Sequence, residues 1–147
     1  MADMRDLLFG GAGGGSRAAD AGLLLLRVFV GLGLALAHGL GKLPPSERFL
    51  AGVAEMGFPF PVLFGWAAGL AEFGGGLLLA VGLLTRPAAL FVGVTMVVAA
   101  FIRQAGSPFG ERELALLYLA PALLFLLAGG GRYALDAVLR KRFATRM

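Results

Sequence analysis

The chain has 147 residues, of which 59% are hydrophobic and 15% are charged, and its mean hydropathy is +0.85. A soluble domain of this size needs a larger charged surface, so the composition excludes that class and indicates one domain embedded in a membrane. With no cysteine and one histidine, the chain lacks thiol chemistry and the ligands of a histidine-rich metal centre, so we expect no metal site. The net charge of +4 lies largely after the last apolar run, where it indicates membrane topology and not nucleic-acid binding.

The chain begins with a segment rich in glycine. Residues 1–20 contain "GGAGGGS", three acids and two arginines, which predicts a flexible tail. The first apolar run, 21–41, is long enough to cross a hydrocarbon core of about 30 Å, although Arg27 and His38 interrupt it. A cleaved signal peptide is the alternative, because "ALA" at 35–37 resembles a cleavage site, but an arginine inside the apolar run argues against it.

A short amphipathic helix is predicted between the first two spans. Ser46 follows two prolines and is a good N-cap, and Phe49, Leu50, Val53 and Met56 recur at helical spacing. Charged residues occupy the opposite face, which is typical of a helix that lies on the membrane surface.

The second and third apolar runs are separated only by the turn "LLTRPA". The second, 60–84, can cross the membrane with some tilt. The third, 86–103, holds about 15 apolar residues, which is short by the usual criterion. We expect it to span because Arg86 and Arg103 can extend from its two ends to the headgroup level.

The fourth run, 113–131, contains Pro121 and is followed by a basic tail, 132–147. The predicted fold is therefore all-α: residues 21–131 form an integral membrane four-helix bundle with one interfacial helix. Four spans place both termini on one side of the membrane.

Counting lysine and arginine assigns that side, since these residues are enriched in cytoplasmic loops. The side of the termini carries Arg5, Arg17, Arg86, Arg132, Arg140, Lys141, Arg142 and Arg146, and the other side carries Lys42, Arg48, Arg103 and Arg112. We therefore predict a multi-pass protein of the cell inner (plasma) membrane with a cytoplasmic N-terminal tail and a cytoplasmic C-terminal tail.

The charges of the first span fall on one face. At 100° per residue, Arg27, Gly31, Ala35, His38 and Lys42 lie within about 80° of one another on a regular α-helix. His38 is either a proton shuttle, because a free imidazole titrates near neutrality, or a histidine at the headgroup level.

On the second span, Gly65, Gly69, Glu72 and Gly76 fall within about 60°, so the acid lies in a groove of small residues. If the two faces meet, Glu72 lies between the levels of Arg27 and His38. One reading is a buried Glu72–Arg27 ion pair that sets the helix register. The other is a polar cavity for a proton, a quinone head group or another polar ligand.

These motifs resemble the DoxX family of small four-span membrane proteins. The similarity covers about residues 26–136 and rests on "RVFVGLGLALAHGLGKL", "MGFPFP", "AEFGGGLLLAVGLLTRPAAL" and "GGGRYALD". It implies a role in redox metabolism, since some relatives are subunits of thiosulfate:quinone oxidoreductases and others associate with oxidative-stress enzymes. More distant relatives are non-catalytic assembly or cargo-export factors. Arg27, Lys42 and Glu72 match polar positions of the family, whereas His38 does not.

We therefore expect a small membrane subunit of a redox system, at most the membrane subunit of an oxidoreductase complex, with a polar pocket between the first two helices. The expected ligand is a quinone, and the expected partners are the lipid bilayer and proteins of a redox complex. The alternatives are a membrane scaffold or assembly factor and, more weakly, a small transporter or proton pathway; the glycine-rich faces also permit a homo-oligomer. The predicted pocket residues are Arg27, His38, Lys42 and Glu72, and the predicted helix-packing residues are Gly31, Gly65, Gly69, Gly75 and Gly76.

Overall fold

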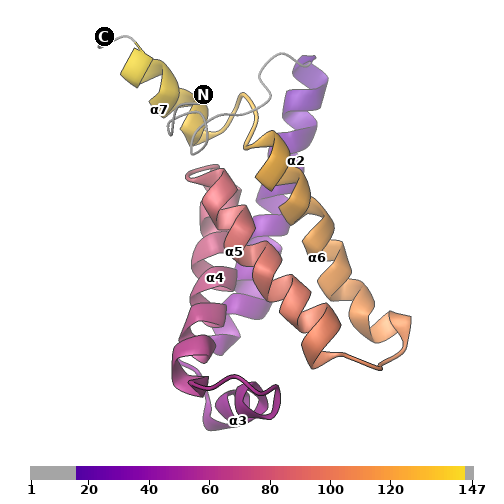
Figure 1. Ribbon diagram of the computed structural model, residues 1–147. Helices are drawn as coiled ribbons and strands as arrows, with labels where there is room; N and C mark the ends of the chain where they lie inside the picture. The colour runs from indigo at the N-terminus through magenta and orange to yellow at the C-terminus, as the bar shows by residue number, and fades with distance from the viewer. Residues whose placement is uncertain (1–15, 145–147) are drawn as a thin grey trace, which may run out of the picture.

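The computed structural model describes residues 16–144, and these residues are folded into helices joined by short turns (Figure 1). The α-helices are α2 (Arg17–Gly33), α3 (Glu47–Glu55), α4 (Pro61–Val81), α5 (Thr85–Val98), α6 (Phe109–Ala128) and α7 (Leu135–Ala144). Two π-helical turns extend α2 and α5, and a 3-10 turn follows the first of them: η1 (Leu34–Gly39), η2 (Leu40–Lys42) and η3 (Ala99–Arg103). The all-α prediction is thus confirmed for the described part of the chain.

The predicted terminal tails are shorter than expected. Helix α2 already begins at Arg17, because the side chain of Ser16 accepts a hydrogen bond from the backbone N–H of Ala19 (3.2 Å) and caps the helix. The predicted flexible tail therefore does not extend to residue 20, and its first 15 residues lie outside the described residues. The segment predicted as a basic C-terminal tail contains α7, and its last three residues likewise lie outside the described residues.

Four helices run along the long axis of the molecule, and each packs on its neighbour in the order α2, α4, α5, α6. The short helix α3 lies across one end, and α7 extends from the other end, where its residue Asp136 bonds to the turn between α4 and α5 (Figure 1). The predicted interfacial helix is thus a real helix, and Ser46 caps it by accepting from the N–H of Phe49 (3.3 Å).

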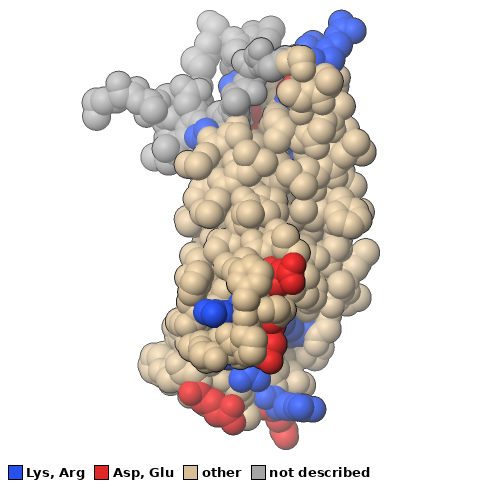
Figure 2. Space-filling view, turned by 90° about the vertical axis from the view of Figure 1, so that its right-hand side faces the viewer, with Lys and Arg blue, Asp and Glu red and all other residues tan. Residues whose placement is uncertain are grey.

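The surface is apolar where the surface of a soluble protein would be charged. Large side chains such as Phe29 (81% exposed), Leu127 (76%) and Leu117 (62%) point outward. Charged side chains gather at the two ends of the bundle, with a broad uncharged band between them (Figure 2). Within residues 16–144, three helical segments are long and apolar enough to cross a membrane: Arg17–Lys42, Pro61–Val81 and Thr85–Arg103. Helix α6 has 20 residues but carries three charged residues near its start. By length and composition, three of the four predicted membrane spans are therefore supported among the described residues.

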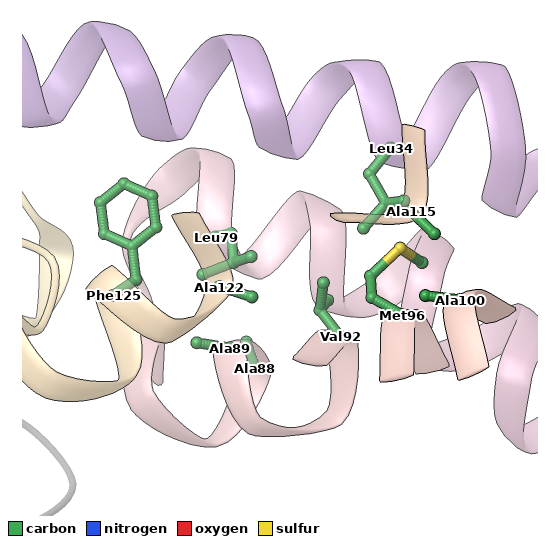
Figure 3. Close-up of a cluster of buried hydrophobic side chains, with 10 residues drawn as sticks. All are labelled: Leu34, Leu79, Ala88, Ala89, Val92, Met96, Ala100, Ala115, Ala122 and Phe125. Carbon is green, nitrogen blue, oxygen red and sulfur yellow. The ribbon is translucent and has the colours of Figure 1, made fainter. Parts of the chain in front are cut away.

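The core is built largely from alanine. Buried side chains of α4, α5 and α6 meet around Leu79, Val92 and Phe125, each with 0% exposure (Figure 3). The alanines of this core are Ala88, Ala89, Ala100, Ala115 and Ala122. Small residues let membrane helices approach closely, and the gain comes from van der Waals contact because lipid is as apolar as the helices.

Helices α2 and α4 touch through their backbones. A Cβ atom at Gly31 would collide with the carbonyl oxygen of Gly76, and a Cβ atom at Gly39 would collide with the backbone nitrogen of Phe73. Gly75 faces a different neighbour, since its Cβ position lies 3.1 Å from a methyl group of Val92 on α5. Along this contact the two helices leave no space for a ligand.

Candidate ligand-binding cavity

Two charged side chains from distant parts of the chain meet on α4. Lys42 is the last residue of η2, and its Nζ lies 2.5 Å from Oε1 of Glu72. The same ammonium lies 5.5 Å from the ring centroid of Phe49 on α3, a distance typical of a cation–π contact. The side chain of Glu72 is 3% exposed and that of Lys42 is 30% exposed, so the pair reaches from the interior to the surface.

The second oxygen of this carboxylate has no hydrogen-bond partner among the described residues. Oε2 of Glu72 is buried and accepts no hydrogen bond from the part of the chain that the structure describes. A buried polar atom left unpaired costs about 1–3 kcal/mol, and in native proteins it usually marks a bound water, an ion or a functional role. The free oxygen therefore marks the place where a ligand could donate a hydrogen bond.

A cavity of about 510 Å³ lies beside the pair, between α3, α4 and α5. This volume is within the range of small-molecule sites, roughly 300–1,000 Å³. The polar side chains of its lining are Glu72, Lys42, Thr95, Arg48 and Arg103. Most of the remaining lining is apolar and includes Phe49, Met56, Phe64, Ala71, Phe91 and Val98. An apolar cavity with a few converging polar groups suits a ligand that has a polar head and an apolar body.

The position of this cavity corrects the sequence prediction. The pocket was expected between the first two spans, α2 and α4, but there the glycine contacts close the interface, and the cavity lies on another face of α4. The structure brings Lys42 and Glu72 together in the cavity wall. Arg27 and His38 are not among the residues that line it.

Two glycines of α4 allow the linker to reach this wall. The Cβ position of Gly69 lies 2.7 Å from a methyl carbon of Leu43 and 3.2 Å from the carbonyl oxygen of Lys42. The Cβ position of Gly65 lies 2.5 Å from a methyl carbon of Leu50 on α3. A side chain at Gly69 would press on Leu43 and on the backbone of Lys42, whereas at Gly65 the methyl group of Leu50 can move aside. Gly69 thus lets the linker lie close to α4, where Lys42 reaches Glu72.

His38 lies on another side of the bundle. Its half-buried imidazole packs edge-on against Tyr118 of α6, with 5.4 Å between the ring centroids. It belongs to the π-helical turn η1, where the wider turn changes the direction of the side chains that follow. The face calculated for a regular α-helix therefore does not hold beyond Leu34.

Arg27 lies toward the opposite end of the bundle from the cavity and is 1% exposed. Its guanidinium donates to the carbonyl oxygens of Gly130 (3.0 Å) and Tyr133 (2.8 Å), in the loop between α6 and α7. The predicted pairing of Arg27 with Glu72 is therefore wrong. Arg27 instead connects the loop that follows α6 to α2 through these two hydrogen bonds.

Asp136, also in this region, has a structural role that was not predicted from the sequence: it caps the start of α5. Its two carboxylate oxygens accept from the backbone N–H groups of Leu84 (2.8 Å) and Thr85 (2.9 Å), and its own N–H donates to the carbonyl oxygen of Gly82 (2.9 Å). A carboxylate at a helix N-terminus is stabilised by free N–H groups and by the helix dipole. The motif "GGGRYALD" contained Asp136, but nothing in the sequence indicated which helix it would cap.

The chain was compared with known proteins. Residues 22–105 match the family described as DoxX. "Inner membrane protein YqjF" of Escherichia coli (strain K12) is 29% identical over 133 residues, which cover 84% of this chain and 96% of that protein. "Putative oxidoreductase CatD" of Bacillus subtilis (strain 168) is 30% identical over 122 residues, which cover 82% of this chain and 89% of that protein. No solved structure matches the chain significantly.

Proposed function

The chain belongs to the DoxX family, and from that premise we propose that it is the inner-membrane subunit of an oxidoreductase system and binds a quinone in the cavity between α3, α4 and α5. The names of the two relatives, an inner membrane protein and an oxidoreductase, support the location and the reaction class. The single observation that carries the ligand is that Glu72 lines a largely apolar cavity while its buried Oε2 has no hydrogen-bond partner among the described residues.

We further propose four membrane crossings, with α6 as the fourth. Arg86, at the start of α5, donates to the carbonyl oxygen of Leu127 (2.9 Å), at the end of α6, so α6 returns along the whole length of α5. Arg27 in α2 binds Gly130, just after α6, which brings the end of α6 to the end of the bundle where α2 begins (Figure 1). An even number of crossings follows, and the excess of Lys and Arg at that end favours a cytoplasmic location for both termini.

The residues present fit a quinone. A quinone carries electrons and protons between membrane proteins, and its polar ring oxygens are joined to an apolar body and tail. The apolar walls suit the body, Lys42 can donate a hydrogen bond to a ring carbonyl oxygen, and Oε2 of Glu72 can accept one from a ring hydroxyl of the reduced form. Glu72 lies about 16 Å along α4 from Pro61, near the middle of the helix, where a hydrogen bond is little weakened by water.

A partner protein supplies the electrons in this proposal. The chain has no cysteine, and among residues 16–144 no three side chains of the types His, Cys, Asp and Glu come together as a metal site would need. The role assigned to this subunit is to hold the quinone within the membrane beside the partner's redox group.

Binding of a short-chain ubiquinone analogue to the purified protein tests the proposal. Glu72→Gln keeps an amide oxygen for Lys42 but removes the negative charge and the free carboxylate oxygen. Loss of one charge-assisted hydrogen bond predicts at least about tenfold weaker binding. The matched control is Glu55→Gln, which removes an exposed carboxylate from α3 and should leave binding unchanged.

A second variant tests the cavity without touching the charged pair. Ala71→Leu adds bulk to the lining of the cavity and should weaken binding while Glu72 and Lys42 stay in place. Native mass spectrometry of the gently extracted protein then reports whether a quinone co-purifies. If neither variant changes the affinity, the quinone does not occupy this cavity and the proposal fails.

A further inference from the structure

Two arginines line the cavity near the α3 end of the bundle. Arg48 lies on α3, and Gly52 lies one turn further along the same face. The Cβ position of Gly52 is 4.0 Å from a terminal guanidinium nitrogen of Arg103, the last residue of η3. Both arginines line the cavity. Arg48 and Arg103 are more than 50 residues apart in sequence, and both lie at the same end of one cavity, which we call its mouth.

The side chains that line the cavity carry more positive than negative charges. Its lining contains three cations, Lys42, Arg48 and Arg103, but one carboxylate, Glu72, and that carboxylate is paired with Lys42. Within residues 16–144 no salt bridge or hydrogen bond joins the side chain of Arg48 or Arg103 to a protein group. Each guanidinium offers five N–H donors in a planar fork that matches the oxygens of a phosphate. The mouth thus has the charge and the donors for an anion.

The surroundings of the mouth indicate what the anion is attached to. Phe91 and Val94 of α5 also line the cavity, and they are 61% and 53% exposed. The cavity therefore opens sideways toward lipid. Charged side chains gather at this end of the molecule, just beyond the band (Figure 2), at the level where lipid headgroups lie.

We propose that Arg48 and Arg103 form a binding site for one anionic phospholipid, whose phosphate binds the two guanidinium groups and whose acyl chain lies against Phe91 and Val94 at the lateral opening. The lipid is preferred over a free anion because the cations and the apolar opening are contiguous, and a free anion would use the cations alone. Arg48 and Arg103 line the same cavity as Glu72, but the inference is argued from these two cations and the apolar opening and does not rest on the quinone proposal.

The test is a titration of the delipidated full-length protein in a neutral detergent, with phosphatidylglycerol and phosphatidylcholine as probes and native mass spectrometry as the readout. We expect the protein to retain one phosphatidylglycerol and to bind it more tightly than phosphatidylcholine. The double variant Arg48→Gln/Arg103→Gln should bind phosphatidylglycerol about 30-fold more weakly, as expected for two basic residues at a membrane surface. Arg132→Gln/Arg140→Gln, which removes two exposed arginines at the other end, should bind as the wild type does.

Further measurements test whether the two arginines bind an anionic phospholipid. Arg48→Lys/Arg103→Lys should restore part of the affinity, because it keeps the charges while losing the planar forks, and a thermal melt shows that each variant is folded. Equal affinity for the two lipids, or full retention in the glutamine double variant, would overturn the site. Displacement of the lipid by equimolar inorganic phosphate would overturn the lipid as its ligand. Quinone binding measured on the same samples separates the two proposals, since Glu72→Gln should weaken quinone binding and keep the lipid.

Discussion

The ammonium of Lys42 and Oε1 of Glu72 lie 2.5 Å apart, although the two residues come from different helical segments and are separated by 30 positions in sequence. The carboxylate is buried and the ammonium is only partly so. This asymmetry determines what happens when either partner is removed.

Lys42→Met should destabilise the protein more than Glu72→Gln. Without the ammonium, the buried carboxylate has no counter-charge among the described residues, whereas a lone lysine can turn to water. Breaking a fully buried pair costs about 3–5 kcal/mol, and the partial exposure of Lys42 lowers our expectation to about 2–3 kcal/mol. Thermal unfolding in detergent measures the change, and the double variant Lys42→Met/Glu72→Gln should recover most of it. Equal losses from both single variants would contradict the asymmetry.

Gly39→Ala should disrupt the α2–α4 contact. A Cβ atom there would overlap the backbone of Phe73, and backbone cannot move aside as a flexible side chain can. We expect a loss of more than about 3 kcal/mol, above the usual range for overpacking. Gly22→Ala, in the same helical segment, is the control, because nothing lies within 4 Å of its Cβ position. It should be neutral or stabilise by about 0.5–1 kcal/mol through helix propensity.

Asp136→Ala should weaken the start of α5. Two backbone N–H groups, of Leu84 and Thr85, would lose their acceptor in a buried setting. Loss of a cap costs about 0.5–2 kcal/mol, and a second unsatisfied donor raises the expectation to about 3 kcal/mol. Hydrogen exchange of the peptide that contains Leu84 and Thr85 should accelerate before global unfolding does. Asp136→Asn keeps one acceptor oxygen and should give an intermediate result, whereas unchanged exchange in both variants would rule out the cap.

Arg27→Lys should release the loop between α6 and α7. A single ammonium cannot reach both carbonyl oxygens, of Gly130 and Tyr133, in the fork geometry of a guanidinium. Limited trypsin digestion reports the release, since Arg132 in that loop is exposed and should be cleaved faster. Arg48→Lys is the matched control at the other end and should not change cleavage after Arg132. A cleavage rate unaltered by Arg27→Lys would mean that Asp136 holds the loop without it.

Most helices of this protein can be predicted from its sequence because the signals that mark them are local, although α7, in the segment predicted as a tail, was not predicted. Apolar run length indicates a membrane helix, and Ser46 before a helical pattern indicates the start of α3. Glu72 is conspicuous for the same reason, as one acid among apolar residues whose burial demands a partner. None of these inferences depends on which helix lies beside which.

The partners of the charged residues were decided only by the tertiary structure. Periodicity of 100° per residue placed His38 and Lys42 on the face of Arg27, but the π-helical turn η1 changes that angle from Leu34 onward. Arg27 binds carbonyl oxygens more than 100 positions away, and a backbone carbonyl carries no sequence signal.

The sequence by itself determined the class of the protein, its long apolar helices and α3, and the residue that most needs explanation. The tertiary structure decided that Glu72 pairs with Lys42 and keeps one oxygen free, that the α2–α4 contact is closed, and that the cavity lies between α3, α4 and α5. The physical reason is that hydrophobicity and helix capping are properties of neighbours in sequence. Ion pairing, backbone contact and cavity formation depend on the helix packing, which brings together residues that are far apart along the chain.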